Sequence, residues 1–122
     1  IDTVWAPPSH DDVTVAWISD SIVDGSSYGP FLAGGMLHQR VGKLLGWNDC
    51  WSFATGGTGY KNPGAGSFYT YRQRVAEALT RNPDVWVLFG STNDIGYSGI
   101  EAEALATLQA IRAGSRAPII VL

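Results

Sequence analysis

Three short polar segments of the sequence carry residue types that can do chemistry, and each directly follows an apolar run. The first opens with Ser19-Asp20-Ser21, where the hydroxyl of Ser21 can point into a crevice while backbone N–H groups face a developing anion. The second contains Gly57, and a glycine lets backbone N–H groups approach a ligand without a Cβ in the way. The third contains Asn93, whose carboxamide can donate a hydrogen bond to an oxyanion from a fixed position.

The elements around these segments alternate between strands and helices. Short apolar runs predict buried strands, and apolar residues at helical spacing predict amphipathic helices. The strands are expected at 13–18, 50–55, 85–89 and 119–122, and the helices at about 30–46, 68–81 and from Ile100 to a C-cap at Gly114. The apolar stripes assigned to these helices are Ala33, Leu37, Val41 and Leu44; Arg72, Val75, Ala76 and Leu79; and Ile100, Ala104, Leu108 and Ile111.

This order predicts a single α/β domain over residues 1–122, with a three-layer, flavodoxin-like parallel sheet. The expected strand order is 2-1-3-4. Because the last apolar run ends the chain, a fifth strand is expected from a missing segment or a partner. Right-handed crossovers then place the polar segments 19–29, 56–66 and 90–99 at the carboxyl ends of the strands.

Taken singly, each polar segment also has a simpler explanation. Ser21 can belong to a local turn, the glycine-rich segment can be a flexible connection, and Asn93 can cap the next segment through an Asx turn. The three features carry more weight together, because each follows a predicted strand and all three are expected at one edge of the sheet.

Composition narrows the possible partners. The net charge is -3 and no Lys/Arg stripe is present, so a nucleic-acid partner is not expected. No apolar run approaches the roughly 20 residues needed to span a bilayer. Cys50 is the only cysteine, which excludes a disulfide within the chain and favours a buried structural thiol.

Three sequence blocks carry a resemblance to a known enzyme family. The segments VAWISDSIVDG (15–25), FATGGTGY (53–60) and NPDVWVLFGSTNDI (82–95) resemble, in the same order, three conserved blocks of the SGNH (GDSL-like) hydrolases. The third match is the most specific. The resemblance implies a serine esterase that hydrolyses a small acyl ester through an acyl-enzyme, with no metal or organic cofactor. By position, Ser21 would be the nucleophile, and Ser21 N–H, Gly57 N–H and the Asn93 side chain would form the oxyanion hole.

The sequence departs from the family pattern in three places. Serines stand at Ser19 and Ser91, where glycine is usual in the family, and the late Asp-x-x-His block that supplies the general base is missing. The only histidines are His10 and His38, and both are expected to be solvated or packed. A serine without a base is a weak nucleophile. The resemblance therefore implies that a second chain or a C-terminal segment carries the histidine, and that these residues alone are nearly inactive.

Other functions stay open at this point. Gly25-Ser26-Ser27-Tyr28-Gly29 matches the G-x-S-x-G nucleophile elbow and would make Ser27 the nucleophile, although the preceding strand ends too early for a tight turn. A catalytically inactive module with a carbohydrate-binding or structural role in a larger assembly is the main alternative. Sugar stacking would use Trp5, Trp47 or Trp51, whereas Trp17 and Trp86 are predicted to be core. A mononucleotide binder is disfavoured, because no phosphate-binding motif is complete.

Overall fold

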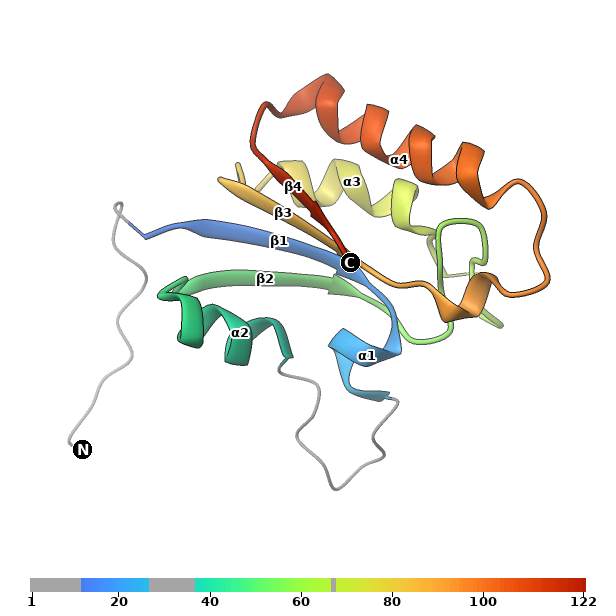
Figure 1. Cartoon of the computed structure of the whole chain (residues 1–122), viewed down its shortest axis with the longest axis horizontal. Coiled ribbons are helices and arrows are strands. Elements are labelled where there is room, and N and C mark those ends of the chain that lie inside the picture. The colour runs from blue at the N-terminus through green and yellow to red at the C-terminus, as the bar shows by residue number, and fades with distance from the viewer. Residues whose placement is uncertain (1–11, 27–36, 67) are drawn as a thin grey trace.

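The computed structural model describes residues 12–26, 37–66 and 68–122, and its centre is a four-stranded parallel sheet. The strands are β1 (Thr14–Ser19), β2 (Asp49–Ala54), β3 (Val85–Phe89) and β4 (Ile119–Val121). Their order is β2-β1-β3-β4, as the sequence predicts (Figure 1). The two central strands, β1 and β3, are the most deeply buried, which explains their almost uniformly apolar sequences.

Helices cover both faces of this sheet, which confirms the predicted three-layer α/β architecture (Figure 1). On one face lie α3 (Tyr71–Leu79) and α4 (Ile100–Gly114), and on the other lie α1 (Ser21–Asp24) and α2 (Leu37–Leu45). The short α1 and the 3-10 turn η3 (Thr92–Asp94) fall in segments predicted as loops. No helix among the described residues has the length and apolar character needed to cross a membrane.

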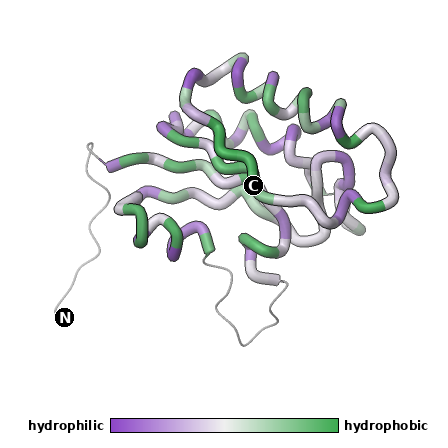
Figure 2. The backbone as a smooth tube through the Cα atoms, viewed as in Figure 1, coloured by the Kyte–Doolittle hydropathy of each residue, from purple (hydrophilic) through white to green (hydrophobic). Residues whose placement is uncertain are grey.

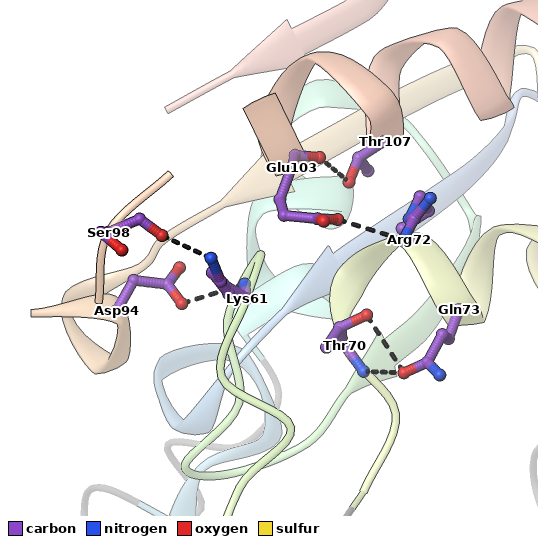
Figure 3. Close-up of polar contacts among 8 residues, drawn as sticks. All are labelled: Lys61, Thr70, Arg72, Gln73, Asp94, Ser98, Glu103 and Thr107. Carbon is purple, nitrogen blue, oxygen red and sulfur yellow. Dashed lines mark hydrogen bonds and ion pairs between the residues drawn. The ribbon is translucent and has the colours of Figure 1, made fainter. Parts of the chain in front are cut away.

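Two helix ends differ from the predictions for local reasons. The second helix was expected from residue 68, but it begins at Tyr71 because Thr70 caps it. The N–H of Thr70 donates to Gln73 Oε1 at 2.9 Å, the contact that Figure 3 also shows. The last helix includes Gly114 as its final residue instead of ending before it, and Ser115 is the C-cap.

Two of the predicted apolar stripes are partly wrong. Leu44 was assigned to the buried face of α2 but is 86 % exposed. On α3, Arg72 and Ala76 are exposed, and the buried residues are Tyr71, Arg74, Val75 and Ala78. Part of the first stripe (Ala33) lies outside the described residues, and the stripe of α4 is confirmed by the packing of Ile100, Ala104, Leu108 and Ile111 into the core.

The core divides into one cluster on each face of the sheet. Trp86 belongs to the larger cluster beneath α3 and α4, and Trp17 belongs to the smaller one beside α2. Both tryptophans are at most 2 % exposed, which confirms the prediction that they are core residues. The half-buried Cys50 also packs against the smaller cluster, and burial together with the charge of Asp49 raises the pKa of its thiol. This environment fits a structural thiol.

The edge strand β4 carries apolar side chains to the surface. Ile120, Val121 and Leu122 are 38 %, 55 % and 62 % exposed, and Figure 2 shows the hydrophobic colour of this segment at the end of the chain. The fifth strand expected beyond β4 stays a prediction.

Candidate active site

The three polar loops start side by side at the carboxyl edge of the sheet. Ser19, the last residue of β1, pairs with Ala54 at the end of β2 and with Phe89 at the end of β3. The N–H of Thr55, the next residue after β2, donates to the carbonyl of Ser19 at 3.2 Å. The expectation that these loops leave the sheet at one edge is therefore confirmed.

Ser21 is the first residue of α1, and it is half-buried. Its backbone position is fixed by Asp20, a fully buried N-cap whose Oδ1 accepts from the N–H of Ile22 at 3.0 Å. Gly25 then ends α1 in the left-handed conformation, at φ 89°. Ser21 thus lies on a structured turn directly after the central strand.

Tyr71 connects this first loop to the third. Its hydroxyl lies 3.4 Å from Asp20 Oδ2 and donates to the carbonyl of Phe89 at 3.1 Å. Burial, followed by the charge of Asp20, raises the pKa of Tyr71, so the hydroxyl stays protonated and can donate. Gly90 is required at this point because a Cβ would run into the Tyr71 hydroxyl. The ends of β1 and β3 are thereby held together beneath the loops.

Gly57 lies at an exposed corner of the second loop. It adopts φ 76°, and a Cβ placed there would meet nothing within 4 Å. The open space means that a ligand can come close to this backbone, while the positive φ favours glycine. The neighbouring Gly56 is crowded by the side chains of Asp24 and Ser26, so the first and second loops are in contact.

Asn93 contacts the loop that contains Gly57. Its Nδ2 donates to the carbonyl of Thr58 at 2.9 Å, and its backbone N–H donates to Ser91 Oγ at 3.2 Å. The first bond orients the half-buried carboxamide, and the second fixes the backbone of Asn93. An amide nitrogen carries two hydrogens, and the bond to Thr58 uses only one of them. The structure therefore brings Asn93 and Gly57 into adjoining positions.

Asp94 ties the second and third loops into one hydrogen-bonded unit. Its buried carboxylate accepts from the N–H groups of Tyr60, Lys61 and Asn62 at 2.8, 3.1 and 2.9 Å. Figure 3 shows the link to Lys61, whose Nζ also donates to the carbonyl of Ser98 at 2.6 Å. Asp94 was predicted only as part of a polar segment, because its partners are backbone groups some 30 residues away and leave no pattern in the sequence.

Arg74 is a second supporting residue that sequence reasoning missed. It is 5 % exposed, and its Nη1 donates to the carbonyls of Ser19 and Phe53, at 2.8 Å each. Its Nη2 donates to Thr58 Oγ1, and its Nε donates to the carbonyl of Tyr69 at 2.9 Å. Burial lowers the pKa of Arg74, and the surrounding oxygens compensate for that burial. One guanidinium thus joins the ends of β1 and β2 to the second loop.

One of the two histidines, His38, lies among the described residues. His38 lies on α2, is 7 % exposed and is therefore packed, one of the two environments expected for it. Burial lowers the pKa of its imidazole. His10 and the alternative nucleophile Ser27 lie outside the described residues. Within the described ranges, no group of three His, Cys, Asp or Glu side chains could hold a metal ion.

No protein-family model matches the chain, and no match to it was found among curated proteins.

Proposed function

We propose that this chain is the serine-bearing part of an esterase that hydrolyses small acyl esters. The observation that carries the proposal is the meeting of three loops at one sheet edge, where Asn93 contacts the loop of Gly57 and that loop contacts the loop of Ser21. Acyl transfer needs a nucleophilic hydroxyl close to hydrogen-bond donors for the oxyanion, and residues of these three types lie on the three loops that meet. The resemblance of the same segments to the SGNH (GDSL-like) hydrolases adds support.

The reaction would proceed through a covalent intermediate. Ser21 Oγ attacks the ester carbonyl carbon as its proton passes to a base, and the carbonyl oxygen becomes an oxyanion. The N–H groups of Ser21 and Gly57 and the Asn93 carboxamide bind this oxyanion. Its collapse expels the alcohol, which takes the proton, and water then hydrolyses the acyl-enzyme. In this proposal a histidine from outside the chain is the base, and no metal or organic cofactor takes part.

Adding imidazole to the chain tests the nucleophile, because free imidazole can replace a missing histidine base. We expect hydrolysis of 4-nitrophenyl acetate to be close to background without imidazole. With imidazole, the rate should exceed that of the Ser21→Ala variant, which measures hydrolysis by imidazole alone. Ser98→Ala, a change of an exposed serine that binds Lys61 through its backbone carbonyl, is the matched control and should retain the effect. If Ser21→Ala responds as the unaltered chain does, the proposal is wrong. If only Ser27→Ala loses the imidazole-dependent rate, Ser27 and not Ser21 is the nucleophile.

The same assay tests the oxyanion role of Asn93. One donor of this type contributes about 3–4 kcal/mol to transition-state stabilisation, so Asn93→Ala should lower the imidazole-dependent rate by about a hundredfold or more. Thr92→Ala changes an exposed neighbour in the same 3-10 turn and should leave the rate near that of the unaltered chain. An unchanged rate in Asn93→Ala would remove Asn93 from the site.

A further inference from the structure

A groove runs between the edge strand β2 and helix α3, and Ser21, Gly57 and Asn93 are not among its lining residues. Its volume is about 610 Å³, within the range of ligand-binding cavities. From β2 it is lined by Trp51, Ser52, Phe53 and Ala54, and from α3 and the turn after it by Arg74, Glu77 and Arg81. The last three are spaced i, i+3 and i+7, which places them on one side of a helix. We call this feature the β2–α3 groove.

Exposed aromatic rings stand along this groove. Trp51, Phe68 and Tyr69 are 37 %, 51 % and 66 % exposed, and all three line it. Keeping apolar aromatic surface in contact with water costs free energy, so a cluster of exposed rings usually marks a binding site. Trp51 extends from β2, whereas Phe68 and Tyr69 precede α3, so aromatic surface comes from two separate elements.

The ring of Trp51 is held in place before any ligand binds. Its Nε1 donates to Asp49 Oδ1 at 2.8 Å, and the guanidinium carbon of Arg81 lies 3.7 Å from the ring centroid. The hydrogen bond and the cation–π contact together restrict the side chain. A fixed ring loses little conformational entropy on binding, which is a property of preformed ligand sites.

The polar groups of the groove narrow the class of ligand. Glu77 offers hydrogen-bond acceptors and Arg81 offers donors, so the groove provides both. Arg74 also lines the groove, but its N–H groups are already occupied by backbone carbonyls. A phosphate-bearing ligand would bring its negative charge beside Glu77, and an acyl chain would remove water from the charged Glu77 and Arg81. A neutral ligand with many hydroxyl groups and an apolar face fits both the rings and the polar groups.

We propose that the β2–α3 groove binds a pyranose ring of a neutral glycan, stacked against Tyr69 and the face of Trp51 that Arg81 leaves uncovered, and hydrogen-bonded to Glu77. This binding would not depend on Ser21. It therefore goes beyond the proposed esterase activity and can be tested independently of it.

The experiment measures retardation of the chain in native gels that contain a soluble neutral polysaccharide: xylan, mixed-linkage β-glucan or galactomannan. The matching hexasaccharide is then titrated by calorimetry. Trp51→Ala removes the fixed ring. Tyr97→Ala is the matched control, because Tyr97 is an exposed aromatic residue (43 %) in the loop before α4, outside the groove. Ser21→Ala separates glycan binding from catalysis, and circular dichroism checks that each variant is folded.

We expect at least one polysaccharide to retard the unaltered chain. Trp51→Ala should weaken binding about tenfold or more, a loss typical of an aromatic stack, while Tyr97→Ala and Ser21→Ala bind as the unaltered chain does. The proposal is overturned if none of the three polysaccharides causes retardation, or if folded Trp51→Ala binds normally. It is also overturned if sedimentation velocity shows a dimer that Trp51→Ala dissociates, because a second copy would then cover the groove.

Discussion

The two faces of the sheet are stabilised in different ways. Beneath α3, two buried polar side chains, Tyr71 and Arg74, lie within the packing, and their hydrogen bonds reach the ends of the strands. Beside α2, the buried cluster is made of apolar side chains such as Val15 and Val87. The buried polar residue on α2 is His38, whose Nδ1 has no hydrogen-bond partner among the described residues.

This difference indicates what each face contributes to the site. On the α3 face, the buried donors point to backbone carbonyls at the points where the loops begin, so the packing of the helix also fixes the loops. The face beside α2 supplies hydrophobic burial, and its one unpartnered imidazole nitrogen costs free energy instead of adding it. We therefore expect that replacing a buried polar residue by an apolar one changes stability in opposite directions on the two faces: a loss on the α3 face, and no loss or a gain on the α2 face.

The largest effect is expected at Arg74. Arg74→Met keeps the length of the side chain but removes the donor to the carbonyl of Phe53 and the hydroxyl of Thr58. It leaves the carbonyl of Ser19 with the N–H of Thr55 alone. Because each buried polar group left unpaired costs 1–3 kcal/mol, we expect a loss of about 3–4 kcal/mol in the free energy of unfolding. Urea unfolding, followed by circular dichroism, measures it.

Arg72→Met is the matched control for this change. Arg72 lies on the same helix, but its ion pair with Glu103, 3.3 Å long and visible in Figure 3, is partly exposed. Exposed pairs contribute roughly 1 kcal/mol or less. Similar losses from Arg72→Met and Arg74→Met would show that the buried network has no special role in stability.

A smaller effect is expected at Asp94. Asp94→Asn keeps the size of the side chain but removes the charge and one acceptor oxygen, while Tyr60, Lys61 and Asn62 still offer their N–H groups. We expect a loss of about 2 kcal/mol in the free energy of unfolding. Asp94→Asn should also speed up amide hydrogen exchange at residues 60–62 more than it does in the strands. Unchanged exchange there would mean that Asp94 does not hold the second loop.

The sequence predicts the architecture well because the sheet depends on local patterns. Apolar runs and helical spacing are visible in short windows, and they place β3 at Val85–Phe89. The observed strand order is the one expected for the flavodoxin-like fold class that the alternation of these elements indicates. The same logic fails on α3, where Arg72 was assigned to the buried stripe but is exposed, and Arg74 is buried instead. Arg74 is buried because carbonyls from β1 and β2 surround it, and those partners are far away in the sequence.

The candidate site shows the same contrast between residues that local patterns predict and residues whose roles depend on distant partners. Ser21, Gly57 and Asn93 follow apolar runs, so their positions at the edge of the sheet could be predicted from the order of the elements. The groups that support them, Tyr71 and Asp94, could not be predicted, because their roles depend on hydrogen bonds between distant loops. Residue type reveals candidate chemistry, whereas the groups that orient it emerge only once the chain is folded.

The smallest and opposite effect is expected at His38. Because its Nδ1 is buried without a partner among the described residues, His38→Leu should leave stability unchanged or raise it by up to about 1 kcal/mol near neutral pH. Burial lowers the pKa of His38, so the unfolded chain binds a proton more readily than the folded chain does. The stability that depends on a neutral His38 is complete above its ordinary pKa of 6.5 and is lost as the pH falls below that value.

The loss of stability on going from about pH 7.5 to pH 5.5 should therefore be smaller in His38→Leu than in the unaltered chain. Gln39→Leu, at the exposed neighbouring position on α2, introduces the same side chain without removing a titrating group, and it should keep the full loss. Urea unfolding at the two pH values provides the measurement. Equal losses in all three proteins would show that His38 does not contribute to the pH dependence, and the contrast between the two faces would then rest on Arg74 and Asp94 alone.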